Sequence, residues 1–234
     1  MSLPVTTFYC TGCDFKQGNA GTWGIREYVL PNGVRVPVDW RLGWCEDCAG
    51  LAAVEVLSED DRLKDLKEAE AELVAHPPRP VRHWWHLHRF ILNCAWYNRI
   101  GEWERARLRL QSKLEDAHDA LDHIRRRSQA RKCLACGSHR VHAPLITNAE
   151  PWNDPEHPKA TGFIHPGCGG ELWMLEDGLR FALRPSVRRY SSEGDLIEKE
   201  FVDGYSTPDS GYFEGRDKAN ALARGAGTAA DVKP

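Results

Sequence analysis

The sequence lacks the segments that mark membrane and exported proteins. No run approaches the ~20 consecutive apolar residues that a membrane-spanning helix needs. The first residues, Met1-Ser2-Leu3-Pro4, have neither the basic nor the apolar region of a secretory signal peptide. We therefore expect a cytoplasmic protein that has no membrane partner.

The chain also lacks a strong net charge and the familiar catalytic motifs. Its 234 residues include 31 Lys and Arg against 34 Asp and Glu, a net charge of −3, so bulk charge does not direct it to nucleic acid or membranes. There is no Walker loop, no Gly-x-Ser-x-Gly and no His-Glu-x-x-His. Enzymes that hold their acids at dispersed positions escape such a search. We assign no catalytic residue and no organic cofactor, and favour a protein that is not an enzyme.

Cysteine, by contrast, is abundant and regularly spaced. Six of the eight cysteines form Cys-x-x-Cys pairs, namely Cys10/Cys13, Cys45/Cys48 and Cys133/Cys136. Without an export signal, this spacing indicates metal binding or redox chemistry before disulfides. Two thiolates on one tight turn can face the same ion, and Zn²⁺ takes four such ligands in a tetrahedron. We interpret Cys94, in a helical run, as a small buried apolar residue.

The first metal site is predicted to use Cys10, Cys13, Cys45 and Cys48. Between the two pairs, Asn32-Gly33 separates two β-prone runs, which predicts a hairpin. The alternative is a duplicated redox motif, which is expected beside a βαβ pattern that is missing here.

The second site is predicted to use Cys133, Cys136, His165 and Cys168. The segment His165-Pro-Gly-Cys-Gly matches a Cys-Pro-x-Cys-Gly knuckle with His in place of the first Cys. The Pro sets the turn, and the final Gly permits a positive φ. Alternative ligands are His139, His142 and His157. Four protein ligands leave no open position at either site, as in structural zinc sites.

Both knuckle pairs resemble zinc-ribbon modules of the rubredoxin-like class, over residues 8–50 and 131–185. The resemblance implies two small β lobes with one Zn²⁺ each, hence two Zn²⁺ per chain. Zinc ribbons occur in transcription, translation, topoisomerase and transposase proteins and in protein–protein adaptors, so the fold alone does not select a function.

The segment between the sites is predicted to be helical. Ser58 and the acids after it have the form of a helix start, and the helix over 58–75 ends before a Pro-rich connector over 76–81. Residues 82–131 contain no Pro and one Gly, Gly101, and predict a long second helix, either continuous or broken at Gly101. A 3-4 apolar repeat from Leu110 to Ile124 favours a coiled coil. Since the first helix is short, we expect it to leave this seam for another copy, another protein or a ribbon lobe.

Positive charge is concentrated in this middle segment. Residues 79–140 carry 14 basic and 6 acidic side chains, whereas the flanking segments are acidic. The candidate phosphate-binding residues are Arg105, Arg107, Arg109, Arg125, Arg126, Arg127, Arg131 and Lys132. The alternative is an ordinary solvated helix surface, or pairing with the acidic first helix. His83 and His86, one helical turn apart among tryptophans, form a weaker candidate metal pair.

The C-terminal part is predicted to add strands and a tail. Residues 171–175 and 179–183 are expected to form a hairpin at Asp177-Gly178, and residues 187–190 and 196–201 another around Glu193-Gly194. Residues 203–234 have little to bury, so we expect a flexible tail.

Together these features predict an α+β protein in which two small zinc-ribbon-like lobes are joined by a long antiparallel helical hairpin or coiled coil. The expected domains are residues 1–57, 58–131 and 132–202, with the tail over 203–234. The favoured function is a non-catalytic adaptor that binds a protein partner or itself through the hairpin. The alternative is nucleic-acid binding through the Arg-rich helix, and a thiol redox enzyme or redox-regulated chaperone is a third interpretation.

Overall fold

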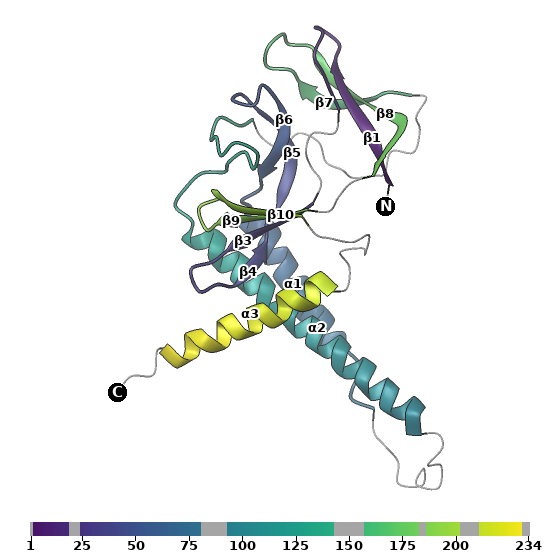
Figure 1. Cartoon of the computed structure of the whole chain (residues 1–234), viewed down its shortest axis with the longest axis vertical. Coiled ribbons are helices and arrows are strands. Elements are labelled where there is room, and N and C mark those ends of the chain that lie inside the picture. The colour runs from purple at the N-terminus through teal and green to yellow at the C-terminus, as the bar shows by residue number, and fades with distance from the viewer. Residues whose placement is uncertain are drawn as a thin grey trace. The chain divides into compact units, whose positions relative to one another are not determined.

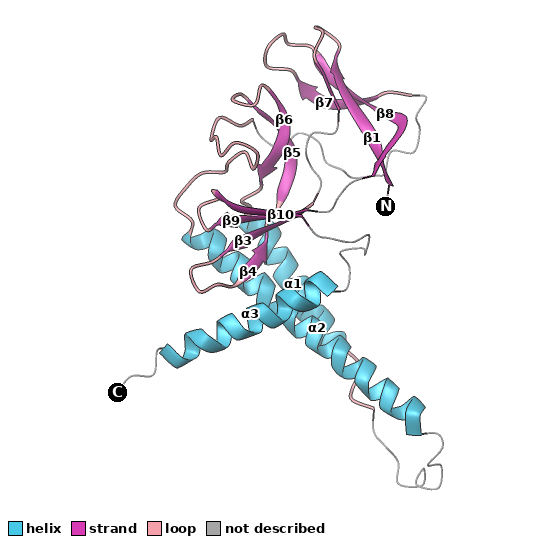
Figure 2. Cartoon of the chain, in the orientation of Figure 1, coloured by secondary structure: helices cyan, strands magenta, loops and turns pink. Residues whose placement is uncertain are grey.

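The computed structural model describes residues 2–18, 24–80, 93–142, 157–182, 186–201 and 211–230. Over these residues the chain is a mixed α+β protein with several small sheets and three helices (Figures 1 and 2). It divides into two compact units. Unit 1 combines Met1–Leu57 with Arg127–Pro234, and unit 2 is Ser58–Arg126.

One sheet of unit 1 combines the two ends of the sequence. Its strand order is β2 (Lys16–Gly18), β1 (Ser2–Cys10), β8 (Glu171–Ala182) and β7 (Lys159–Ile164). β1 runs antiparallel to β8 along its whole length. The hairpin predicted at Asp177-Gly178 is wrong, because β8 is one strand that passes this point through a shift in its register with β1.

A second sheet also mixes early and late segments. Its order is β10 (Leu196–Phe201), β9 (Ser186–Ser191), β3 (Ile25–Val29) and β4 (Arg35–Pro37). The hairpins expected around Asn32-Gly33 and Glu193-Gly194 are both present as antiparallel pairs. Since β3 and β9 pair in parallel, the segments that were expected in two separate lobes share this sheet as well.

The third sheet is the antiparallel pair β5 (Trp40–Cys45) and β6 (Gly50–Glu55). All six residues of β6 are buried. Isolated bridges join Val54 to Cys133 and Cys45 to Val141, so the segment after unit 2 lies against this pair.

Unit 2 contains α1 (Glu59–Ala75) and α2 (Asn93–Arg126). Ser58 is the predicted N-cap, and its hydroxyl accepts the Asp61 amide at 3.1 Å. α2 continues through Gly101, so the alternative with a break there is wrong. It ends at Arg126 rather than Arg131, and the predicted helical residues 82–92 lie outside the described part of the chain.

α1 and α2 lie side by side in antiparallel directions (Figure 1). Ion pairs join Glu59 to Arg125 at 2.8 Å, Glu72 to Lys113 at 2.6 Å and Arg79 to Glu104 at 3.0 Å. These ion pairs join α1 to the part of α2 that carries the Leu110–Ile124 seam, in which Leu121 is buried. That the seam binds a further partner stays a prediction. Because the start of α1 pairs with the end of α2, the extra length of α2 falls at its N-terminal end.

The flexible tail expected over 203–234 is replaced by α3 (Gly211–Ala230) over the residues described there. The fully buried Asn220 holds this helix in unit 1. Its amide oxygen accepts the Arg35 N–H, and its amide nitrogen donates to the Arg35 carbonyl, both at 2.8 Å. These two hydrogen bonds satisfy backbone groups at the outer edge of β4. A tail was expected because residues 203–234 have few apolar side chains to bury, but the contact that holds α3 is polar.

Unit 1 contains a buried carboxylate with several hydrogen-bond donors. Glu55 accepts two hydrogen bonds from the Arg127 guanidinium at 2.6 and 2.9 Å, one from the Tyr28 hydroxyl and one from the Lys132 amide, both at 2.8 Å. The Glu55 and Arg127 side chains are 0% and 1% exposed. Burial and the Glu55 charge raise the pKa of Tyr28. Each carboxylate oxygen thus has two donors, as a buried charge requires.

Within the described residues, no helix combines the length and the apolar character needed to span a bilayer.

Glu55→Ala should lower the free energy of unfolding by about 3–5 kcal/mol, because Arg127 is left as a buried, unpaired charge. Urea denaturation followed by tryptophan fluorescence measures this loss. The matched control is Glu59→Ala, which removes the half-exposed ion pair with Arg125 and should cost less than about 1 kcal/mol. Equal losses in the two variants would show that the buried pair contributes no more to stability than the exposed one.

Candidate metal centres

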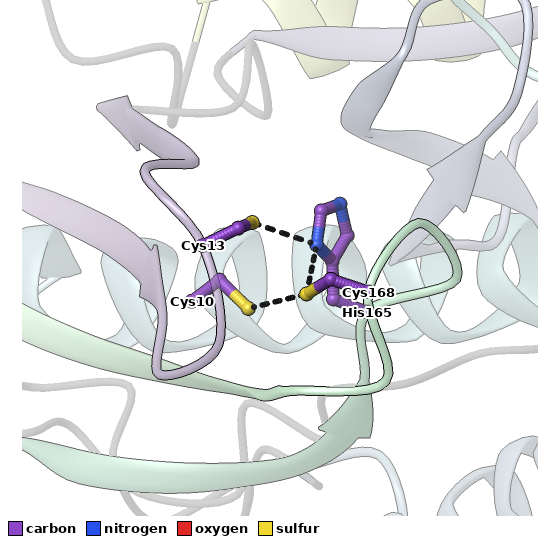
Figure 3. A group of neighbouring side chains, drawn as sticks. All are labelled: Cys10, Cys13, His165 and Cys168. Carbon is purple, nitrogen blue, oxygen red and sulfur yellow. Dashed lines mark hydrogen bonds between the residues drawn. The ribbon is translucent and has the colours of Figure 1, made fainter.

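The first cluster, here called the mixed tetrad, consists of Cys10, Cys13, His165 and Cys168 (Figure 3). Sγ of Cys10 lies 3.3 Å from Sγ of Cys168, and Nδ1 of His165 lies 3.3 Å from the sulfur of both Cys13 and Cys168. Cys10 and His165 are buried, whereas Cys13 and Cys168 are exposed. All four ligand atoms lie within 4.8 Å of one another.

The pairing of β1 with β8 creates this tetrad. Cys10 ends β1 opposite Leu172, so the turn after β1 meets the turn that precedes β8. Their backbones touch at two glycines: a Cβ on Gly170 would lie 2.5 Å from the Gly12 nitrogen. The Gly12 and Gly170 amides also donate to the sulfurs of Cys10 and Cys168 at 3.3 and 3.4 Å. Gly170 is thus required for close approach of the two turns, and a Cβ at Gly12 would be crowded, 3.1 Å from the Gly170 Cα.

The His165 ring is held by aromatic neighbours. Its centroid lies 4.6 Å from the ring of Trp44, edge-on, and 5.0 Å from the ring of Phe15. These contacts leave Nδ1 facing the sulfurs. Nδ1 is free to bind a metal when the neutral ring carries its proton on Nε2.

The second cluster, here called the all-cysteine tetrad, consists of Cys45, Cys48, Cys133 and Cys136. Sγ of Cys45 lies 3.5 Å from that of Cys136, and Sγ of Cys48 lies 3.8 Å from that of Cys133. One pair lies at the turn between β5 and β6, and the other follows α2 along the chain. The bridges between β6 and Cys133 and between Cys45 and Val141 bring the two pairs together.

A left-handed residue follows the second ligand in three of the four turns. These residues are Ala49, Gly137 and Gly169, with φ of 48°, 77° and 75°. The turn reverses the chain directly behind the ligand, which is why glycine is favoured there. Ala49 takes the same conformation without being glycine.

The sulfurs differ in their readiness to ionise. Burial raises the pKa of Cys10 and of Cys136. Hydrogen bonds from backbone amides and neighbouring thiols lower it by more than burial raises it, so the pKa of each thiol lies below its ordinary value. Burial is the largest cause that raises the pKa of Cys133 to about 11. At Cys168 the Gly170 amide lowers the pKa, yet the neighbouring thiols and desolvation bring it to about 11. Protons must therefore leave Cys133 and Cys168 when a metal binds at neutral pH.

The geometry of both tetrads fits a metal ion. In a tetrahedral site with Zn–S bonds of ~2.3 Å, sulfurs lie about 3.8 Å apart. The sulfur pairs described above lie 3.3 to 3.8 Å apart, far beyond the ~2.05 Å of a disulfide. Two tetrads thus fit two metal ions, each with four protein ligands and no open position.

The structure groups the eight predicted ligands but exchanges their partners. We expected Cys10 and Cys13 to share an ion with Cys45 and Cys48, which are their nearest pair along the sequence. Instead the first pair joins His165 and Cys168, and the second joins Cys133 and Cys136. Spacing identifies a half-site, whereas the pairing of β1 with β8 decides which half-sites meet.

The alternative histidine ligands lie outside both tetrads. Among the described residues, His139, His142 and His157 belong to neither, and His142 Nε2 lies 3.0 Å from a Glu46 carboxylate oxygen. His83 and His86 lie outside the described residues, as does the side chain of Cys94.

The eight candidate phosphate-binding residues have different surroundings. Arg127 and Lys132 are buried in ion pairs with Glu55 and Asp195, so they are not available to phosphates. Arg125 and Arg126 pair with Glu59 and Asp122. Arg105, Arg107 and Arg109 are exposed on α2 and, within the described residues, have no carboxylate partner; Arg107 instead lies over the Trp103 ring. Arg131 is half-buried.

Comparison with known proteins adds no family. No protein-family model matches the chain, and neither does any curated protein or solved structure. The interpretation of the two sites therefore rests on the tetrads themselves.

The exchange of partners can be tested by metal counting. The double variant Cys10→Ser/His165→Ala removes two ligands of one tetrad and should lose one of two bound ions. The matched double variant Cys10→Ser/Cys48→Ser has the same number of changes but affects both tetrads, and should lose both ions. Native mass spectrometry and elemental analysis of zinc give the counts. Loss of both ions from the first variant and of one from the second would restore the pairing expected from sequence.

Proposed function

We propose that this protein is a non-catalytic zinc protein whose two structural ions hold together the unit into which a helical interaction module is inserted. The observation that supports this is the composition of the tetrads. Each tetrad takes one ligand pair from the chain before unit 2 and one from the chain after it. The ions thus cross-link the two halves of unit 1 around the insertion.

Zinc is the metal that these donors favour. Thiolate with imidazole selects Zn²⁺ among the abundant divalent ions, and hard ions such as Mg²⁺ and Ca²⁺ take oxygen instead. The second common occupant of a four-cysteine site is iron, which elemental analysis separates from zinc. Free thiolates of this kind require a reducing compartment, and a cytoplasmic location suits them.

A structural role follows from the ligand count. A catalytic zinc keeps one position for water or substrate, whereas both tetrads supply four protein ligands. Binding free energy in such a site is folding free energy, because the ligand pairs are brought together only in the folded chain. The described sheets of unit 1 are small: two have four strands and the third has two. The ions compensate for the limited apolar area that such small sheets can bury.

We propose unit 2 as the interaction module because it is a separate compact unit with exposed apolar side chains. Val74 on α1 is 86% exposed and Leu108 on α2 is 64% exposed. Leu108 lies between Arg107 and Arg109, also exposed. Ion pairs join α1 to the part of α2 that carries the Leu110–Ile124 seam. We therefore propose that the adaptor surface lies on α2 around Leu108, where apolar and basic side chains are exposed.

A photo-crosslinking amino acid at Leu108 should give one discrete protein adduct when the chain is expressed in its native cells. The matched control is the same amino acid at Ile164, a similarly exposed apolar residue of unit 1 at 56%. Denaturing gels and mass spectrometry identify the adducts. Absence of an adduct at Leu108, or the same adducts at both positions, would contradict the adaptor surface.

Nucleic-acid binding is the second candidate, because Arg105, Arg107 and Arg109 are exposed without carboxylate partners in the described part of the chain. If these residues contact phosphates, the affinity for a labelled single-stranded RNA should fall at least tenfold between 50 and 200 mM salt, and it should fall further in the triple Ala variant. Fluorescence anisotropy measures both. If α2 is instead a protein-binding surface, the wild-type chain should bind the RNA no more tightly than the triple Ala variant does.

A further inference from the structure

Two neighbouring residues of β5 belong to different metal sites. Cys45 is a ligand of the all-cysteine tetrad, and Trp44 packs edge-on against His165 of the mixed tetrad, with ring centroids 4.6 Å apart. Successive side chains of a strand point to opposite faces, so one short stretch of backbone serves both sites. Both residues are buried: Trp44 is 6% exposed and Cys45 is 0% exposed. A shift of this backbone would thus disturb both sites.

The Trp44 ring is part of the wall that holds His165 in place. It contacts the ring of Phe15 at 5.1 Å and stacks on that of Phe163 at 6.4 Å. Phe15 lies two residues after Cys13, and Phe163 two residues before His165. The same core cluster includes Cys10. The orientation of the imidazole therefore depends on where β5 places Trp44.

The backbone of Trp44 is tied to the all-cysteine tetrad from the other side. Its carbonyl accepts the His142 N–H at 2.9 Å, in the loop that follows Cys136. Gln17, on the strand after the Cys10/Cys13 turn, makes a second link. Its amide donates to the Leu51 carbonyl and accepts the Leu51 N–H, both at 2.8 Å, on the strand after the Cys45/Cys48 turn. The two sites thus share a rigid connection made of β5 and β6.

We propose that the two sites bind their metal ions cooperatively and that Trp44 is the positioning residue that couples them. The inference rests on the proposed function, since it requires two bound ions. An ion in the all-cysteine tetrad fixes Cys45 and with it Trp44, so His165 is ordered before the other ion arrives. The coupling is reciprocal, because each ion changes the affinity for the other by the same factor. A site that is ordered in advance binds more tightly than one that must be ordered by its ligand.

Native mass spectrometry of the wild-type chain during zinc titration tests the coupling directly. When one ion is bound per chain on average, independent sites leave at least half of the chains with one ion, whatever their two affinities. A tenfold coupling between equal sites lowers this fraction to about a quarter. We expect a fraction well below one half, with the metal-free and two-zinc species dominant. A fraction of one half or more overturns the proposal.

Trp44→Leu tests the role of the ring while it keeps an apolar side chain. The fraction of chains with one ion should rise to one half or more, and Trp44→Phe should restore part of the wild-type behaviour. The control is Trp40→Leu, on the same strand, since the Trp40 ring lies against Arg26 and not against a metal ligand. A wild-type distribution in Trp44→Leu overturns the role of Trp44. If that variant fails to fold, Trp44→Met decides, because it also removes the ring and its flexible side chain fills more of the core space. An unchanged distribution in Trp44→Met has the same meaning.

Cobalt gives an independent readout in solution. The absorption bands of a four-sulfur Co²⁺ site and a three-sulfur, one-nitrogen site differ, and cooperative filling makes both grow in constant ratio throughout the titration. Sequential growth of the two bands contradicts coupling. If neither zinc nor cobalt binds, the proposed function itself fails. If two ions bind independently, only the cooperative inference fails.

Discussion

The structure depends on one constraint: metal-binding half-sites from distant parts of the chain must meet in pairs. Cys10 and Cys168 are 158 residues apart, and their sulfurs lie 3.3 Å from each other. Closing a loop of this length has an entropic cost that no single weak contact offsets. β1 and β8 provide the contact by pairing along nine residues of β1, and the two glycines let the turns at the end of that ladder touch. A metal ion held by the tetrad would then fix the arrangement by direct bonds.

Hydrogen bonds between polar side chains and backbone groups join the segments of unit 1. Glu55 gathers donors from β3, from the residue after α2 and from the start of the next metal-binding turn. Gln17 and Asn220 each pair an amide side chain with both backbone groups of a strand residue, Leu51 and Arg35. Such amide pairs imitate a further strand and satisfy backbone groups at a sheet edge. The small sheets are thus joined by specific hydrogen bonds where apolar area is limited.

This construction explains how a helical unit can be inserted in the middle of the unit that contains both tetrads. Glu55 and Arg127 flank unit 2 in the sequence, and their buried ion pair brings the two ends of the insertion together inside unit 1. Within unit 2, ion pairs join α1, and Arg79 just after it, to α2, and none of them involves a metal ligand. Each unit therefore has interactions of its own.

Local patterns in the sequence were enough to identify the eight residues that form the two tetrads, the N-cap of α1 and the hairpins around Asn32-Gly33 and Glu193-Gly194. These features depend on residues a few positions apart, where turn chemistry and ligand spacing act. The partners of each half-site, the burial of Arg127 and the docking of α3 through Asn220 depend on segments that meet from opposite ends of the chain. Spacing cannot rank the alternatives, because every Cys-x-x-Cys turn offers the same two thiolates. The pairing of β1 with β8, which has no local signature, makes the choice.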